Sequence, residues 1–130
     1  MKLKYKVYLS REVSSRLSLL ASRLGMLPNL ICRIGFCLSL EEPTIPDPRQ
    51  FSGDKDGKEF NRYTLTGDWE LLFNSLLKQR LAKDGLDPIA DFDDQFSAHL
   101  GRGVLLLYDR VKSLKELRGR DNLLMRVRIN

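Results

Sequence analysis

Residues 1–40 read MKLKYKVYLSREVSSRLSLLASRLGMLPNLICRIGFCLSL, and this stretch decides the fold. From Leu3 onward, apolar residues and tyrosine alternate with lysine, which is the period of a β-strand with one buried face. Ser10 then supplies a helix N-cap. Apolar residues recur at spacings of four, three and four from Val13 to Leu24, as on one face of a helix. The sequence therefore predicts a strand followed by an amphipathic helix.

A second helix follows after a tight turn. Gly25 suits the C-terminal cap of the first helix, and Pro28 suits the first turn of the next. Residues 29–40 are apolar nearly all round, so this helix must be buried, most easily by a partner chain. Strand, helix, turn and helix in this order are typical of a ribbon-helix-helix module, in which two strands pair across a dimer axis and lie in the DNA major groove.

The rest of the chain predicts a helical half behind a long connection. Residues 41–65 are rich in proline and glycine, with a short strand expected over residues 59–65. A third helix is expected to begin at Thr66 or Asp68 and to end near Gly85. Its predicted apolar stripe is Trp69, Leu72, Phe73, Leu76, Leu77 and Leu81.

The last helical region is expected to begin at Asp87-Pro88. Its predicted core side is Ile89, Phe92, Phe96, Leu100, Leu107, Val111 and Leu114. Gly101 and Gly103 indicate either a break in this helix or a close backbone approach around Arg102. Beyond it, residues 118–122 are expected to be irregular, and the end of the chain to form a short strand or a frayed tail.

We therefore expect a mainly α protein, α+β by its short N-terminal strand, with a ribbon-helix-helix-like N-terminal module and a helical C-terminal half. We expect one domain over residues 1–118, followed by a basic tail over residues 119–130. Within the domain, the module covers 1–40, the connection 41–65 and the helical half 66–118.

Composition excludes several classes of protein. The chain has 130 residues, 42% hydrophobic and 30% charged, which suits one globular domain. No apolar run is long enough to span a bilayer, so no membrane partner is expected. Two cysteines and no secretory signal predict a cytoplasmic protein. Phosphate-binding glycine motifs and metal-ligand spacings are absent, so we expect no cofactor and no metal site.

Charge is distributed unevenly along the chain. Residues 1–40 carry seven Lys or Arg against one acid, and residues 110–130 carry seven against two. The middle is acidic, with four against six over residues 41–65 and four against eight over residues 66–109. A basic N-terminal module is typical of a protein that binds nucleic acid.

The basic residues of the module are the candidate DNA contacts. They are Lys2, Lys4, Lys6, Arg11, Arg16 and Arg23. Lysine suits phosphates but reads bases poorly, so we expect backbone recognition with little sequence preference. An alternative is that the lysines only protect an edge strand against aggregation.

Other reactive residues point more weakly to chemistry. Cys32 and Cys37 are predicted to be buried core residues. Arg33, if buried, is predicted to need a carboxylate or a phosphate, with a structural ion pair favoured. His99 is the only histidine. It is a possible general base, although a lone helical histidine is more often structural. An acidic cluster follows the turn at Asp87-Pro88 and is made of Asp91, Asp93 and Asp94.

The run Arg33-Ile34-Gly35-Phe36-Cys37-Leu38-Ser39-Leu40 and the segment His99-Leu100-Gly101-Arg102-Gly103 resemble the DndE family over residues 3–118. These are the small subunits of the bacterial DNA phosphorothioation (restriction-modification) machinery. The resemblance implies a ribbon-helix-helix-like homotetramer, built as a dimer of dimers, that binds DNA and favours nicked duplex. It also implies partner subunits that activate and insert sulfur in place of a backbone phosphate oxygen.

The expected function is therefore a non-catalytic DNA-binding subunit, with no catalytic residues of its own. Two alternatives stay open at this point. One is a ribbon-helix-helix transcriptional repressor, although the long C-terminal half argues against it. The other is an enzyme that nicks DNA with His99 and one of the nearby aspartates.

Overall fold

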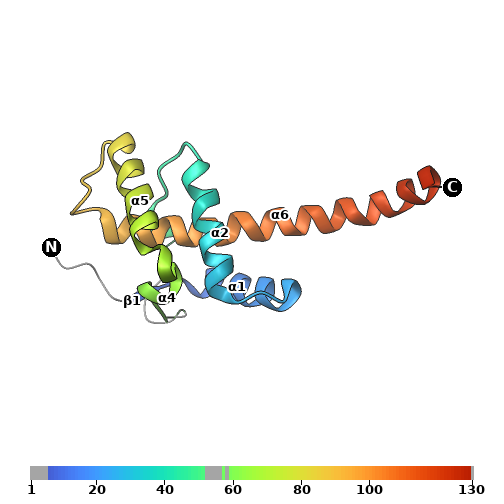
Figure 1. Cartoon of the computed structure of the whole chain (residues 1–130), viewed down its shortest axis with the longest axis horizontal. Coiled ribbons are helices and arrows are strands. Elements are labelled where there is room, and N and C mark those ends of the chain that lie inside the picture. Colours follow the sequence, from blue (N-terminus) through green and yellow to red (C-terminus); the bar gives the residue numbers. More distant parts are fainter. Residues whose placement is uncertain (1–5, 52–56, 58, 130) are drawn as a thin grey trace.

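Helices form most of the molecule, around one long helix that extends well beyond the body (Figure 1). The computed structural model describes residues 6–51, 57 and 59–129, with side chains described up to Leu114. A two-stranded antiparallel sheet is the only sheet among these residues. The expected mainly α architecture with a short N-terminal strand is confirmed.

The N-terminal module has the predicted order of elements. Strand β1 covers Lys6–Tyr8, helix α1 Arg11–Leu24 and helix α2 Pro28–Glu41. The Ser10 side chain accepts a hydrogen bond from the Val13 amide (3.2 Å), and Gly25 ends α1 with φ 62°. Residues 1–5, the rest of the predicted strand, lie outside the described residues.

One edge of β1 pairs within the same chain. Strand β2, Glu59–Asn61, runs antiparallel to β1, with Val7 opposite Phe60. The strand predicted over residues 59–65 is therefore only half right, because helix α4 begins at Arg62 and ends at Thr66. The pairing of two β1 strands across a dimer axis stays a prediction.

The middle of the chain contains more helix than its prolines and glycines suggested. Helix α3 covers Pro48–Phe51, and the 3-10 helix η1 covers Gly67–Trp69. Helix α5, Glu70–Asp84, then runs as predicted to Gly85, which adopts φ 73° as a C-cap. The Asp87 carboxylate accepts hydrogen bonds from the amides of Ile89 and Ala90 at 2.7 and 2.9 Å and so organises the following turn.

Helix α6 covers Phe92–Ile129 without a break. The irregular segment predicted at 118–122 and the predicted terminal strand or frayed tail are therefore wrong. Of the two alternatives predicted for Gly101 and Gly103, the break is absent and the close backbone approach is confirmed. A Cβ at Gly101 would overlap the Phe51 carbonyl oxygen.

The crossing of α2 over α6 holds the body together. A Cβ on Gly35 would lie 2.7 Å from the carbonyl carbon of Gly103, and a Cβ on Gly103 would overlap the carbonyl oxygen of Gly35. Two backbones can approach this closely only where neither residue has a side chain. A single contact thus explains why Gly35, in the Arg-Ile-Gly-Phe run, and Gly103, directly after Arg102, are both glycine.

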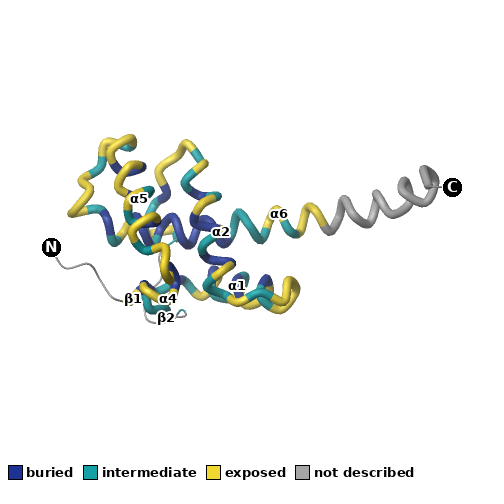
Figure 2. The backbone as a smooth tube through the Cα atoms, viewed as in Figure 1, coloured by how far each residue is buried: buried dark blue, intermediate teal, exposed yellow. Residues whose placement is uncertain are grey.

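Burial along the predicted apolar stripes differs between helices (Figure 2). Val13, Leu17 and Leu20 of α1 are fully buried, as predicted. The core also takes Phe36, Phe73, Leu77, Leu81, Phe92, Phe96 and Leu100. The stripe predictions were wrong at five positions, where the side chains are exposed: Leu24, Trp69, Leu72, Ile89 and Leu114.

Among the described residues, no single helix is both long and apolar enough to cross a membrane. Helices α1 and α2 reach such a length and composition only when taken together, and they are bent by 113° at the turn between them.

Candidate nucleic-acid interface

Two arginines of α1 lie beside an aromatic ring of α6. Arg16 Nη1 donates a hydrogen bond to the Tyr108 hydroxyl (3.3 Å), and its guanidinium carbon lies 4.6 Å from the ring centroid. Arg23, two helical turns further along α1, lies 6.0 Å from the same centroid. The ring therefore holds both guanidinium groups on one side of the molecule by cation–π attraction.

These two arginines keep their charge available. No carboxylate among the described residues forms a salt bridge with Arg16 or Arg23. Arg62 and Arg80, by contrast, pair with Glu70 and Asp84. A guanidinium oriented by an aromatic ring rather than by a carboxylate can still form a two-pronged contact with a phosphate.

The strand part of the predicted interface is different. Lys6 Nζ lies 3.2 Å from Glu59 Oε1, and the hydrogen bond and charge of Glu59 raise the pKa of Lys6. The ammonium group is thus partly neutralised by a carboxylate of β2. Lys2 and Lys4 lie outside the described residues.

Arg11 is exposed at the start of α1. It lies five residues before Arg16, about 140° away around the helix, so it does not share the Tyr108 face. The structure therefore brings together two of the six predicted contacts and places Lys6 and Arg11 apart from them.

His99 lies in the core rather than at this surface. Its side chain is fully buried, and Nδ1 lies 2.8 Å from the Ser39 hydroxyl. Burial, together with the positive charges of Arg102 and Arg80, lowers its pKa to about 3. His99 is therefore neutral and shielded from solvent. This fits the structural role rather than the alternative role of a general base.

Two buried arginines complete a network with Ser39 at the end of α2. Arg102 donates from Nε to the Ser39 hydroxyl and from Nη2 to the Ser39 carbonyl, both at 2.8 Å. Arg80 donates to the Leu40 and Thr44 carbonyls, both at 2.7 Å. The bonds to the Ser39 and Leu40 carbonyls support the last turn of α2, where the Ser39 carbonyl also accepts from the Glu42 amide, and the bond to Thr44 holds the segment that follows the helix. The network is structural, and its groups point inward.

The predictions for Arg33 and Cys37 need correction. Arg33 donates to the carbonyl oxygens of Leu65 (2.5 Å) and Thr64 (3.3 Å) at the end of α4, so carbonyls replace the expected ion-pair partner. Cys32 is buried, as predicted, but Cys37 is exposed on the opposite side of α2. Partial burial, and next the charge of Glu41, raise the pKa of the Cys37 thiol, which disfavours the reactive thiolate.

No group of three potential metal ligands lies close together within the described part of the chain. The acidic cluster does not converge, since Asp91 accepts a hydrogen bond from the Asp87 amide (2.8 Å) while Asp94 is exposed.

Tyr108 is the functional candidate that sequence reasoning missed. In the sequence it is one aromatic residue in an apolar run, and nothing local links it to α1. The available signal is its helical spacing from Lys112 and Lys115, which places an aromatic residue at the start of a basic face.

Comparison with known proteins agrees with this architecture. The crystal structure of DndE from Escherichia coli B7A, involved in DNA phosphorothioation modification, superposes with a TM-score of 0.65 at 25% identity, covering 82% of this chain and 99% of that chain. A DndE mutant involved in DNA phosphorothioation shares the fold, with a TM-score of 0.63 at 23% identity, covering 82% of this chain and 99% of that chain. A comparison with curated protein sequences found no match. The model of the DNA sulphur modification protein DndE matches residues 6–115, and the chain therefore belongs to the DndE family.

Proposed function

We propose that this protein is the non-catalytic DNA-binding subunit of a cytoplasmic DNA phosphorothioation complex. It binds the backbone of duplex DNA rather than base edges, and it favours duplex that carries a nick. Family membership supports a role in DNA phosphorothioation, because DndE proteins act in DNA sulphur modification.

The observation that carries the proposal is the pair of arginines over Tyr108. Arg16 and Arg23 are positioned by one ring, and no described carboxylate neutralises them. Each guanidinium matches the geometry of a phosphate group. The same observation favours contact through α1 over contact through the strand, where Lys6 is held by Glu59.

A non-catalytic role fits the position of His99. A general base must reach the proton that it removes, and a fully buried imidazole offers no access to a phosphodiester. We therefore favour DNA binding over the nicking alternative. Membership of the DndE family likewise favours this role over an operator-specific repressor.

We also propose that copies of this chain associate through α2, as in the expected dimer of dimers. Its outward face keeps apolar side chains partly in solvent, with Leu27 64%, Leu30 38% and Ile34 44% exposed. These residues recur at spacings of three and four and form one stripe, which a second copy would cover. Light scattering at micromolar concentration should show a dimer or tetramer, and a stable monomer would contradict this part of the proposal.

The experiment is fluorescence anisotropy with intact and nicked duplexes of two unrelated sequences over a salt series. Arg16→Gln with Arg23→Gln should weaken binding to both sequences equally and lower the salt slope by about 1.8 per bound chain, at about 0.9 for each phosphate contact.

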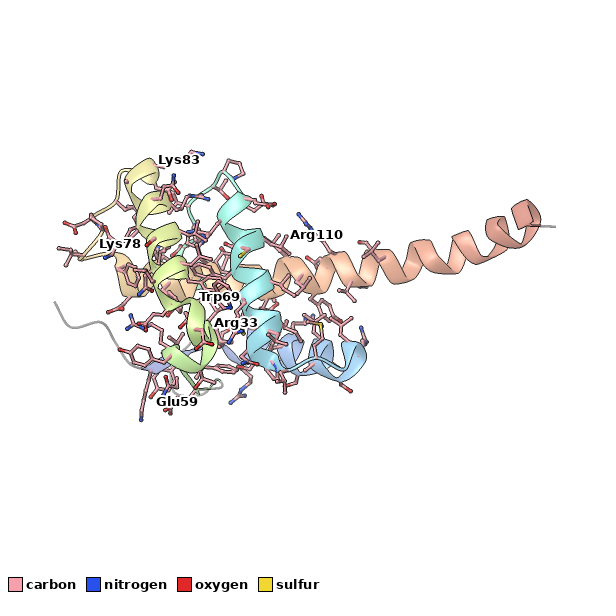
Figure 3. The ribbon with its side chains drawn as sticks, viewed as in Figure 1. Arg33, Glu59, Trp69, Lys78, Lys83 and Arg110 are labelled. Carbon is pink, nitrogen blue, oxygen red and sulfur yellow. The ribbon has the colours of Figure 1, made fainter. Side chains whose placement is uncertain are left out.

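Lys78→Gln with Lys83→Gln is the matched control, because it removes the same charge from exposed positions on α5 (Figure 3). Equal losses in both double variants would show a net-charge effect and contradict the site. A separate Lys6→Gln variant compares the strand with the helix. If it causes the larger loss, the DNA lies along the strand.

A further inference from the structure

Helix α5 keeps apolar side chains in solvent as well as in the core. Trp69 ends the 3-10 helix η1 directly before α5 and is 58% exposed, and Leu72, one turn later, is 49% exposed. Phe73 and Leu77 of the same helix are buried. A helix that is covered on one side only needs apolar residues on that side alone, so Trp69 and Leu72, the Trp69 patch, indicate a further contact.

The Trp69 patch adjoins the exposed stripe of α2, made of Leu27, Leu30 and Ile34. Arg33 of α2 reaches the corner before α5, where a Cβ on Gly67 would lie 2.5 Å from Arg33 Nη2. Gly67 begins the 3-10 turn that ends at Trp69, and Figure 3 shows Arg33 and Trp69 at the junction of α2 and α5. Leu30, three residues before Arg33, is its neighbour on the helix surface. The stripe and the patch therefore meet at Arg33.

The area of the α2 stripe alone is small for a stable association. A large apolar residue presents on the order of 200 Å² when fully exposed, so the exposed fractions of the three stripe residues leave about 300 Å² in solvent. A standard interface buries about 800 Å² on each partner, and about 65% of it is apolar between identical subunits. The Trp69 patch adds roughly 200 Å², and the total of about 500 Å² matches that apolar share.

The charges beside the patch suit a second copy of this chain. Arg33 is partly exposed, and Asp68, directly before Trp69, is exposed. Neither forms a salt bridge within the described part of the chain. In an interface with two-fold symmetry the same surface faces itself, so a surface with one base and one acid can place opposite charges against each other.

We propose that a second copy of this chain covers the Trp69 patch together with the α2 stripe, in a two-fold interface with Trp69 as its anchor. This inference rests on the proposed association through α2 and extends it to α5. Tryptophan is among the residue types most enriched at the energetic centres of interfaces. Arg16 and Arg23 contact α6 from α1 and take no part in this surface, so they stay available to DNA.

Trp69 is the only tryptophan of the chain, so its fluorescence reports on the patch directly. The full chain is diluted from micromolar to nanomolar concentration while light scattering follows its mass. In the assembly, Trp69 should be shielded from quenching by acrylamide. On dissociation its emission should move to longer wavelength and its quenching should increase, because the indole returns to water.

Substitutions test the patch without relying on fluorescence. Trp69→Gln should raise the dissociation constant of the assembly at least about 30-fold, and Leu72→Gln at least about 10-fold. Ile89→Gln is the matched control, because Ile89 is 62% exposed in the turn between α5 and α6 and lies outside the patch. It should leave the dissociation constant unchanged, and circular dichroism shows whether each variant is folded.

Strong acrylamide quenching of Trp69 in an intact assembly would overturn the inference, because the patch would then be open to a different protein. Equal effects of Leu72→Gln and Ile89→Gln would overturn it as well. If Leu27→Gln with Ile34→Gln still dissociates the assembly in these cases, the association through α2 stands without the Trp69 patch. A chain that is monomeric at every concentration would contradict both, whereas the Arg16/Arg23 variant tests DNA binding independently.

Discussion

The two halves of α6 show how one helix can serve two purposes. From Phe92 to Val104 it is almost wholly buried, and it contributes His99, Arg102 and the close contact at Gly103. From Asp109 to Leu114 it is mostly exposed, and the helix then extends beyond the body (Figure 1). Both halves contain apolar residues at helical spacing, so the pattern predicts helix in both and does not distinguish them. What differs is whether another element of the chain covers the apolar side.

Glycine substitutions should separate the two halves most strongly. Gly103→Leu places side-chain atoms where the Gly35 carbonyl lies, and we expect a loss of more than about 3 kcal/mol in the free energy of unfolding, or no folding at all. Gly119→Ala, in the projecting half, should leave that free energy unchanged or raise it by up to about 1 kcal/mol through helix propensity.

Urea denaturation followed by circular dichroism measures both variants. A tolerated Gly103→Leu would mean that α2 and α6 are not in contact as described. A strongly destabilising Gly119→Ala would mean that the second half is also packed.

Serine-to-alanine substitutions should give the next largest difference in stability between the buried and the exposed half of the structure. Ser39→Ala removes the partner of His99 Nδ1 and of Arg102 Nε, so two buried polar groups lose a hydrogen bond. We expect a cost of about 3 kcal/mol in the same denaturation experiment. Ser113→Ala, exposed on the second half, should change stability by less than about 0.5 kcal/mol. Similar values for the two would show that the network does not stabilise the fold.

The smallest effect is a pH dependence that arises in the first half alone. The pKa of His99 is about 3 in the folded chain, against the ordinary imidazole value of 6.5 in the unfolded chain. Between these values the unfolded state binds the extra proton, so the stabilisation is complete above pH 6.5 and declines as the pH falls toward 3. Between pH 6.5 and 5.5 the parent should lose about 1 kcal/mol more than His99→Asn, because the unfolded imidazole is already half protonated at pH 6.5. An identical pH profile for the two proteins would contradict the buried, neutral imidazole.

Local sequence patterns anticipated much of the N-terminal module and only part of the helical half. The caps at Ser10 and Gly25 act within a few residues, as does the stripe beginning at Val13. Each appears in the structure as predicted, except that Leu24 at the end of the stripe is exposed. Trp69 and Leu72 also lie at helical spacing, yet both are exposed, because spacing identifies an apolar face without showing what covers it. Cys37 was misjudged for the same reason.

The candidate site divides in the same way. The sequence alone identified Arg16 and Arg23 as basic residues on α1, but it could not distinguish them from Lys6 or Arg11. Tyr108 lies 92 residues from Arg16 along the chain, and only the packing of α1 against α6 brings the two together. Likewise, Glu59 reaches Lys6 only through the pairing of β1 with β2.

The sequence by itself therefore determined where the N-terminal helices begin and end, the uneven charge, and the DndE motif, since these depend on residue type and short-range spacing. Only the tertiary structure decided that Gly35 meets Gly103, that Arg102 caps the end of α2, and that one ring orients two arginines. Those contacts join residues far apart in the chain, and their energies depend on distances and burial that no local pattern encodes.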